Sequence, residues 1–403
     1  MSLELAHRLS SVAPSATLAM AAEAAKLSAR GVKVFPFSVG EPDFPTPGHV
    51  IEAANRALAA GATRYTAVGG TPELKAAIVA ATRDHRGYET TADRITVSCG
   101  AKHVLFNLAS VLYEPGDEVI IPAPYWVSYP EQVRLMGATP VIVETSEADG
   151  FLLRPADLER AITPKTKALI LCTPSNPTGA AYPKEALLAL LEVAAKGSFY
   201  VIVDEIYGDL VYDGFEFVSL GRVGGALGER LIVVDGVSKT YAMTGWRIGW
   251  SIASPAITKA LGVVQGQSTT NPAAVSQAAA VAALTGARDS VDAMRTAFER
   301  RRNLMVGGLN TIPGVRCRMP EGAFYAFADV RGLIGKRAGQ GSTEKVLATD
   351  DDIAMWLLSE AHAATVAGGP FGAPGYLRLS YACADADITA GLEAIRTAVA
   401  GLR

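Results

Sequence analysis

The chain has 403 residues, of which 49% are hydrophobic and 19% charged, and this composition excludes a disordered or collagen-like protein. Its formal net charge is -3, and no cluster of Lys and Arg stands out, so nucleic acid is not expected as a partner. The four cysteines form no CxxC pair and the five histidines show no ligand spacing, so we expect neither a disulfide framework nor a metal site.

The N-terminus lacks a basic region followed by an apolar run, so it is not typical of a secretory signal. The most apolar helix-like run, residues 273–286, is well short of the roughly 20 residues that a membrane span needs, and it contains Gln277. We therefore expect a soluble, cytoplasmic protein with no membrane partner.

Six short runs rich in Val, Ile and Leu alternate with helical patterns through the middle of the chain. They are residues 94–98, 118–122, 140–144, 167–172, 199–204 and 230–235. Continuous apolar strands separated by helices, such as the one expected over 183–192, are typical of a mostly parallel sheet that is covered on both faces. The pattern predicts a large α/β domain.

The pattern changes from about Thr296 onward. A charged helix over 298–304, a strand pair near 323–327 and a closing helix after Asp385 predict a smaller α+β unit. We expect residues 48–295 to form the large domain. Residues 1–47 and 296–403 are expected to form a small domain that closes on substrate.

Polar and aromatic residues follow the predicted strands, at the edge where open parallel sheets bind their ligands. They are residues 100–102, 124–126, 173–176, 204–207 and 238–239. Lys239 alone could be a surface cation whose stem packs on apolar neighbours. Arg247, however, follows it by eight residues. Desolvation and a nearby cation lower the pKa of a lysine, which frees its amine to form a Schiff base with an aldehyde.

Asp204 closes an apolar strand, where an aspartate can cap a following helix. It can also keep a pyridine nitrogen protonated, which pyridoxal phosphate requires to act as an electron sink. Tyr207 would lie on the same face of that helix and donate to the phenolic oxygen of the ring. Asn176 is placed by two prolines and can bind the same oxygen, or be a turn asparagine.

Residues 100–102 lie between a strand and a helix, so their amides can cradle a phosphate, although many such junctions are simple turns. Arg247 can add a bidentate contact and Ser238 a hydroxyl. Trp126, in a proline-containing loop, is either a core residue or a flat surface on which a ring stacks.

Taken in chain order, this set resembles the class I/II aminotransferases among the fold type I pyridoxal-phosphate enzymes. The motifs that carry the resemblance are Ser38-Val-Gly-Glu-Pro-Asp-Phe44, Tyr65 with Gly69-Gly-Thr-Pro-Glu-Leu74, Ser98-Cys-Gly-Ala-Lys102, Pro124-Tyr-Trp126, Ser175-Asn-Pro-Thr-Gly179, Asp204-Glu-Ile-Tyr207, Ser238-Lys239, Gly245-Trp-Arg-Ile-Gly249, Pro320-Glu-Gly-Ala-Phe-Tyr325 and Arg378-Leu-Ser-Tyr381. The resemblance implies a large domain with a mostly parallel seven-stranded sheet covered by helices, plus a smaller α+β domain.

The resemblance also implies pyridoxal 5'-phosphate as cofactor and Lys239, Asp204 and Tyr207 as catalytic residues, with Lys239 as covalent anchor and proton shuttle. The implied cofactor-binding residues are Tyr65, Gly100, Ala101, Lys102, Trp126, Asn176, Asp204, Tyr207, Ser238, Lys239 and Arg247. The implied substrate-binding residues are Gly40, Lys102, Trp126, Asn176 and Arg378, which binds the α-carboxylate as a planar fork. Tyr65 would reach the phosphate of a neighbouring subunit, so the resemblance implies a homodimer with shared sites.

The resemblance is to bacterial aspartate aminotransferases, in which the lysine of the Gly-Ala-Lys loop, here Lys102, faces the distal carboxylate with help from residues 14–17. It implies ping-pong transfer of the amino group from aspartate or glutamate to 2-oxoglutarate or oxaloacetate. Three alternatives stay open. Lys102 can be a phosphate-side or exposed lysine, the substrates can be prephenate, aromatic or varied amino acids, and the enzyme can be a lyase using the same cofactor.

Overall fold

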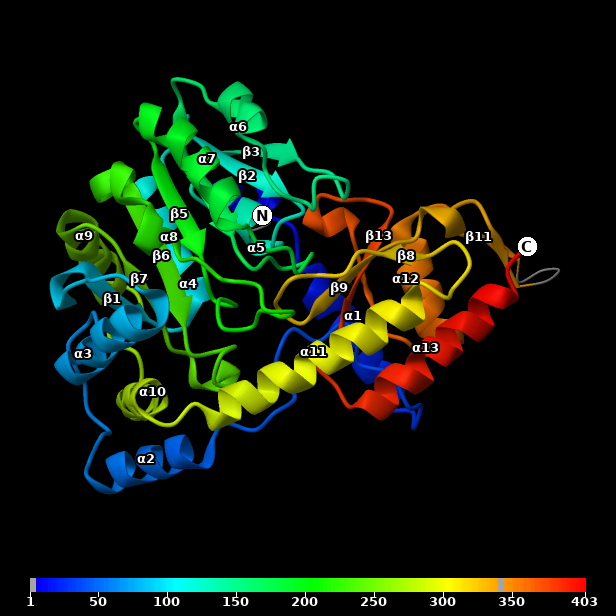
Figure 1. Ribbon diagram of the computed structural model, residues 1–403, viewed down its shortest axis with the longest axis horizontal. Coiled ribbons are helices and arrows are strands. Elements are labelled where there is room, and N and C mark those ends of the chain that lie inside the picture. Colours follow the sequence, from blue (N-terminus) through cyan, green and yellow to red (C-terminus); the bar gives the residue numbers. More distant parts are fainter. Residues whose placement is uncertain (1–4, 340–343) are drawn as a thin grey trace.

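The computed structural model describes residues 5–339 and 344–403, and it is built around a seven-stranded sheet (Figure 1). The strands are β1 (Ile95–Ser98), β2 (Glu118–Ala123), β3 (Thr139–Glu144), β4 (Thr166–Cys172), β5 (Tyr200–Asp204), β6 (Leu231–Gly236) and β7 (Gly249–Ile252), in the order β1-β7-β6-β5-β4-β2-β3. The predicted mostly parallel sheet is confirmed. The four-residue strand β7 was not predicted, and it runs antiparallel to both of its neighbours.

Helices cover both faces of this sheet, as continuous apolar strands require. In β5, Val201 and Val203 face one apolar cluster while Ile202 faces the other. The first cluster includes residues of α2 (Gly48–Ala59), α3 (Pro72–Ala81), α6 (Pro155–Ala161), α7 (Lys184–Lys196), α8 (Leu220–Val223) and α10 (Ala274–Thr285). The second includes residues of α4 (Ala101–Leu112), α5 (Ser128–Leu135) and α9 (Pro255–Gly266). None of the helices in the described ranges is long and apolar enough to cross a membrane.

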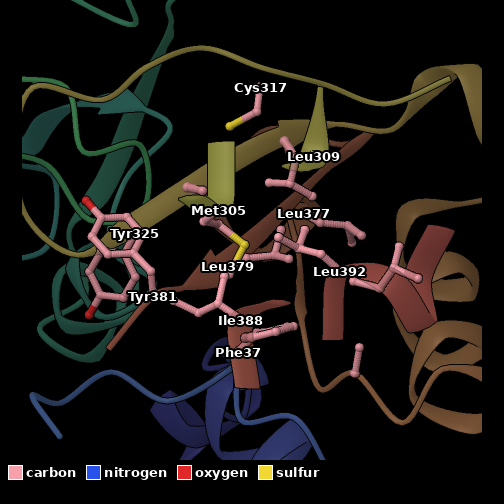
Figure 2. Close-up of a cluster of buried hydrophobic side chains, with 14 of the residues drawn as sticks. Phe37, Met305, Leu309, Cys317, Tyr325, Leu377, Leu379, Tyr381, Ile388 and Leu392 are labelled. Carbon is pink, nitrogen blue, oxygen red and sulfur yellow. The ribbon is translucent and has the colours of Figure 1, made fainter. Parts of the chain in front are cut away.

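A second, four-stranded sheet has the order β12-β13-β9-β8. Its strands are β8 (Arg316–Cys317), β9 (Tyr325–Asp329), β12 (Val366–Ala367) and β13 (Tyr376–Ser380), while β10 (Arg337–Ala338) and β11 (Lys345–Val346) form a separate pair. The helices of this part are α1 (Ala16–Ser28), α11 (Asp289–Leu309), α12 (Asp350–Glu360) and α13 (Asp385–Ala400). Figure 2 shows its core, where Phe37 of the N-terminal segment meets Leu379 and Ile388 near the C-terminus.

Helix α11, drawn in yellow in Figure 1, extends from the larger part of the molecule to the smaller one. The predicted helix over 298–304 is therefore only the middle of a 21-residue helix. The predicted domain boundary between residues 295 and 296 falls inside it, and the helix contributes Val291 to a cluster of the larger part and Phe298 to that of the smaller one. The exact division of the chain into domains stays a prediction.

Candidate active site

A cavity of about 340 Å³ lies where the carboxyl ends of the large sheet meet the smaller part of the molecule. The structure brings most of the predicted site residues to its wall, namely Gly40, Ala101, Lys102, Trp126, Asn176, Asp204, Tyr207, Ser238, Lys239, Arg247 and Arg378. Tyr129, Cys172 and Tyr325 line the same cavity, and no role was predicted for them. Of these, Tyr325 ends the motif Pro320-Glu-Gly-Ala-Phe-Tyr325 and Cys172 ends the predicted strand over 167–172.

Lys239 follows β6 in a turn, and its Nζ donates a hydrogen bond to the carbonyl oxygen of Gly40 at 2.6 Å. Burial lowers the pKa of Lys239 to about 8, against the opposing charge of Glu41, and the positive charges of Arg247 and Arg378 add to the lowering. A lysine amine in this state is available as a base or a nucleophile near neutral pH.

Asp204 ends β5 with only 3% of its surface exposed. Its carboxylate accepts hydrogen bonds from the Tyr129 hydroxyl at 2.9 Å and from the Ile206 amide at 3.2 Å. Burial raises the pKa of Asp204 to about 6. A buried carboxylate whose charged form is this costly is suited to a cationic partner inside the cavity.

The helix predicted after Asp204 is wrong, and with it the helix cap and the shared helical face. Residues 206–209 form a turn, and the chain then makes an antiparallel bridge between Val211 and Gly322. This tertiary pairing leads the backbone towards the smaller part of the molecule. The turn nevertheless presents Tyr207 to the cavity, where its hydroxyl lies 3.0 Å from that of Tyr325.

Gly100 precedes α4 with a φ of 86°, which a side chain rarely adopts. A Cβ atom there would lie 2.6 Å from Nη2 of Arg247, so glycine is what lets the guanidinium approach the helix N-terminus. The guanidinium is held by Nη1, which donates to the Thr244 carbonyl at 2.9 Å. Amides at the positive end of a 12-residue helix beside an arginine form a suitable site for a phosphate.

Arg378 is a fully buried cation, 1% exposed, between the rings of Tyr325 and Phe371. Nη1 donates to Asn176 Oδ1 at 3.0 Å and Nη2 donates to the Ser38 carbonyl at 2.9 Å. Within the described parts of the chain, Nε has no hydrogen-bond partner and no acidic side chain pairs with the guanidinium, while burial lowers its pKa. Burying an unpaired cation is costly, so this arrangement fits a carboxylate that comes from outside the chain.

Lys102 lies in the first turn of α4 with its Nζ 4.9 Å from the centre of the Trp126 ring. Partial burial, together with the charge of Arg247, lowers its pKa. Ser15 and Thr17 of the N-terminal segment line the same cavity. Lys102 is thus on the cavity wall, where it can face either a phosphate or a substrate.

Gly100 is not itself on the cavity wall, although it directly precedes Ala101, and Tyr65 is the predicted site residue that this chain leaves exposed. It is 90% exposed and does not line the wall. Its expected contact with a neighbouring subunit stays a prediction.

Comparison with known proteins matches residues 32–395 to the family described as "Aminotransferase class I and II". The chain is 45% identical over 394 residues to an aspartate aminotransferase of Rhizobium meliloti, covering 98% of this chain and 95% of that one. It is 44% identical over 399 residues to an aspartate/prephenate aminotransferase of Cereibacter sphaeroides, covering 99% of each.

Solved structures agree with this assignment. The crystal structure of the Rhizobium meliloti aspartate aminotransferase matches with a TM-score of 0.95 at 43% identity and covers 100% of both chains. The Thermus thermophilus aspartate aminotransferase with maleate matches with a TM-score of 0.91 at 42% identity, over 98% of this chain and 100% of that one. The chain therefore belongs to the class I and II aminotransferases.

Proposed function

We propose that this aminotransferase moves the amino group of L-aspartate or L-glutamate to 2-oxoglutarate or oxaloacetate by a ping-pong reaction that uses pyridoxal 5'-phosphate. One observation carries the proposal. One cavity holds Lys239, with a pKa lowered to about 8, and Asp204, with a pKa raised to about 6. It also holds the buried Arg378, which forms no ion pair with any acidic side chain among the described residues.

The residues around the cavity fit the cofactor, which supplies an electron sink when it is bound. Asp204 would face the ring nitrogen, since its buried carboxylate has donors on both oxygens and needs a positive partner. The other proposed contacts to the ring are Lys239 as covalent anchor, Trp126 on its face, and Tyr207 and Asn176 at the phenolic oxygen. Around the phosphate would lie the backbone amides of Gly100, Ala101 and Lys102, the side chains of Ser238 and Arg247, and Tyr65 contributed by a second subunit.

Arg378 would bind the α-carboxylate of the amino acid through its planar fork, assisted by Gly40 and Asn176. The fork is already oriented by its bonds to Asn176 and Ser38, so little freedom is lost on binding. Lys239 would take the proton from the α-carbon and return it later in the cycle. Its pKa of about 8 suits both transfers, because an acid–base group works best near the ambient pH.

Selection of a dicarboxylic substrate would rest on Lys102, with residues 14–17 closing over it. Support comes from its position on the cavity wall beside Ser15 and Thr17, and from the relatives named aspartate aminotransferase. A prephenate, aromatic or broad specificity is the second candidate, because one relative is named aspartate/prephenate aminotransferase. A lyase reaction is the third.

We also propose a cytoplasmic homodimer with shared sites, whose partners are amino acids and 2-oxo acids rather than nucleic acid or membrane. Tyr65, which is 90% exposed in the single chain, is free to make the contact with a second subunit that this proposal requires.

A half-reaction panel tests the proposal. The loss of cofactor absorbance is followed with aspartate, glutamate, alanine and phenylalanine, and in reverse with prephenate. We expect aspartate and glutamate to react fastest, and Lys102→Ala to lower kcat/KM for aspartate by roughly 10- to 100-fold while leaving phenylalanine unchanged. A Lys102→Ala variant that keeps its preference for aspartate would contradict the role of Lys102, and release of ammonia or carbon dioxide would indicate a lyase.

A further inference from the structure

Tyr325 contacts two residues of the cavity wall, Tyr207 and Arg378. It begins β9, is 1% exposed and lines the cavity. Its hydroxyl lies 3.0 Å from the Tyr207 hydroxyl, and its ring centre lies 4.5 Å from Cζ of Arg378. Gly40 passes so close that a Cβ there would be 3.3 Å from the Tyr325 oxygen.

We propose that Tyr325 is a positioning residue for both cofactor and substrate. Its hydroxyl acts on the cofactor through Tyr207, and its ring orients Arg378 for the carboxylate of the substrate. The inference rests on the proposed function, because Tyr207 and Arg378 have their roles only if cofactor and substrate bind as proposed.

The proposed role of the Tyr325 hydroxyl follows from the number of protons that the two tyrosine hydroxyls can donate. A tyrosine hydroxyl has one proton and two lone pairs. If Tyr207 gives its proton to the phenolic oxygen of the cofactor, its own oxygen is left as an acceptor, and Tyr325 is the hydroxyl within 3.0 Å that can donate to it. Hydrogen bonds in such a chain strengthen one another, so Tyr325 makes Tyr207 a better donor. Cys172 and Arg378 are the other titratable groups that act on both hydroxyls.

The ring part follows from strand register. β9 and β13 pair antiparallel with Tyr325 opposite Ser380, and Arg378 lies two residues away on the same face. A diagonal pair of this kind is within reach of an aromatic and a long side chain. The buried guanidinium thus rests against a ring face in place of an acidic partner, and cation–π attraction fixes the plane of its fork.

The hydroxyl is tested by absorbance titration of the cofactor-loaded protein, which reports the pKa of the Lys239 nitrogen. A weaker bond to the phenolic oxygen leaves more negative charge there, and that charge holds the nitrogen proton more tightly. We therefore expect Tyr207→Phe to raise this pKa by roughly one to two units and Tyr325→Phe to raise it by roughly 0.1 to 0.6 of a unit. In the double variant the second change should add nothing.

Tyr381→Phe is the matched control. Tyr381, which Figure 2 also labels, is a buried tyrosine of the same hydrophobic cluster and directly follows Ser380, the strand partner of Tyr325. Its hydroxyl, however, donates to the Ala323 carbonyl, and it does not line the cavity. Tyr381→Phe should therefore leave the pKa of the Lys239 nitrogen unchanged. An unchanged pKa in Tyr325→Phe, or an equal shift in the Tyr207→Phe background, overturns the hydroxyl part.

The ring is tested by calorimetric binding of succinate, a dicarboxylate without an amino group. Tyr325→Phe keeps the ring and should bind as the unaltered protein does, while Tyr325→Leu should bind roughly 2- to 30-fold more weakly. Tyr325→Met serves in its place if the leucine variant does not fold. Equal binding by the variant without a ring overturns this part.

The same measurements separate the two claims. If the unaltered protein takes up no pyridoxal phosphate or binds no succinate, the proposed function fails and the inference fails with it. If it binds both and Tyr325→Phe titrates normally, the proposed function stands and only the hydroxyl part of the inference fails.

Discussion

Replacing Asp204 by Asn tests whether this buried carboxylate is kept for a ligand at the expense of stability. Its pKa is raised from 3.8 to about 6 by burial. A raised pKa means that the folded protein holds the proton more tightly than the unfolded chain does, so stability is fully present below about pH 4 and is lost as the pH rises through about 6. The asparagine does not titrate. Its Oδ1 can still accept from the Ile206 amide, and its Nδ2 can donate to the Tyr129 hydroxyl oxygen, which reverses the direction of that bond.

In the cofactor-free protein, the stability of Asp204→Asn relative to the unaltered chain should therefore grow by about 2 kcal/mol between about pH 4 and about pH 8. The assay is urea denaturation at several pH values and one fixed protein concentration. Adding pyridoxal phosphate should reverse the advantage, since the charged carboxylate then gains a positive partner. A stability difference that does not change with pH would refute the reasoning.

Two further changes probe the cavity and its phosphate site, and a third probes a buried ion pair that does not line the cavity. Gly100→Ala places a side chain at a φ of 86° and against Arg247. The dissociation constant of pyridoxal phosphate, measured by fluorescence, should therefore rise about 10-fold. An unchanged constant would contradict the proposed phosphate site at Gly100. Arg378→Lys removes the fork, and kcat/KM for every amino acid substrate should fall roughly 10- to 100-fold. A fall for dicarboxylates alone would mean that Arg378 holds the distal group. Arg86 forms a buried ion pair with Asp209 at 2.7 Å. Arg86→Leu removes this cation and should lower the free energy of unfolding, measured in urea, by about 3 kcal/mol. A loss below about 1 kcal/mol would contradict this expectation.

Much of the large sheet was predictable because each buried parallel strand is a continuous apolar run. The six predicted runs match β1 to β6 within one residue at each end. Strand β7 has only four residues and begins with a glycine, and its place depends on close approach to α4, where a Cβ on Gly249 would lie 2.3 Å from the Ala101 amide. Nothing local in the sequence signals that approach.

The site was predictable where strand ends carry a reactive residue, as at Lys239 and Asp204. It was not predictable where a side chain acts across the fold. Tyr129 reaches Asp204 over 75 positions of sequence, and Tyr325 reaches Tyr207 over 118. The turn after Asp204 was mistaken for a helix, because the bridge from Val211 to Gly322 that redirects the backbone is a tertiary contact.

The central claim is that Lys239 is the covalent anchor of pyridoxal phosphate. The most direct measurement is borohydride reduction of the loaded protein, followed by mass spectrometry of its peptides. We predict one modified lysine, Lys239, and loss of the modification when aspartate is added before the reduction. Modification of Lys102 in its place, or no modification of any lysine, would contradict the account.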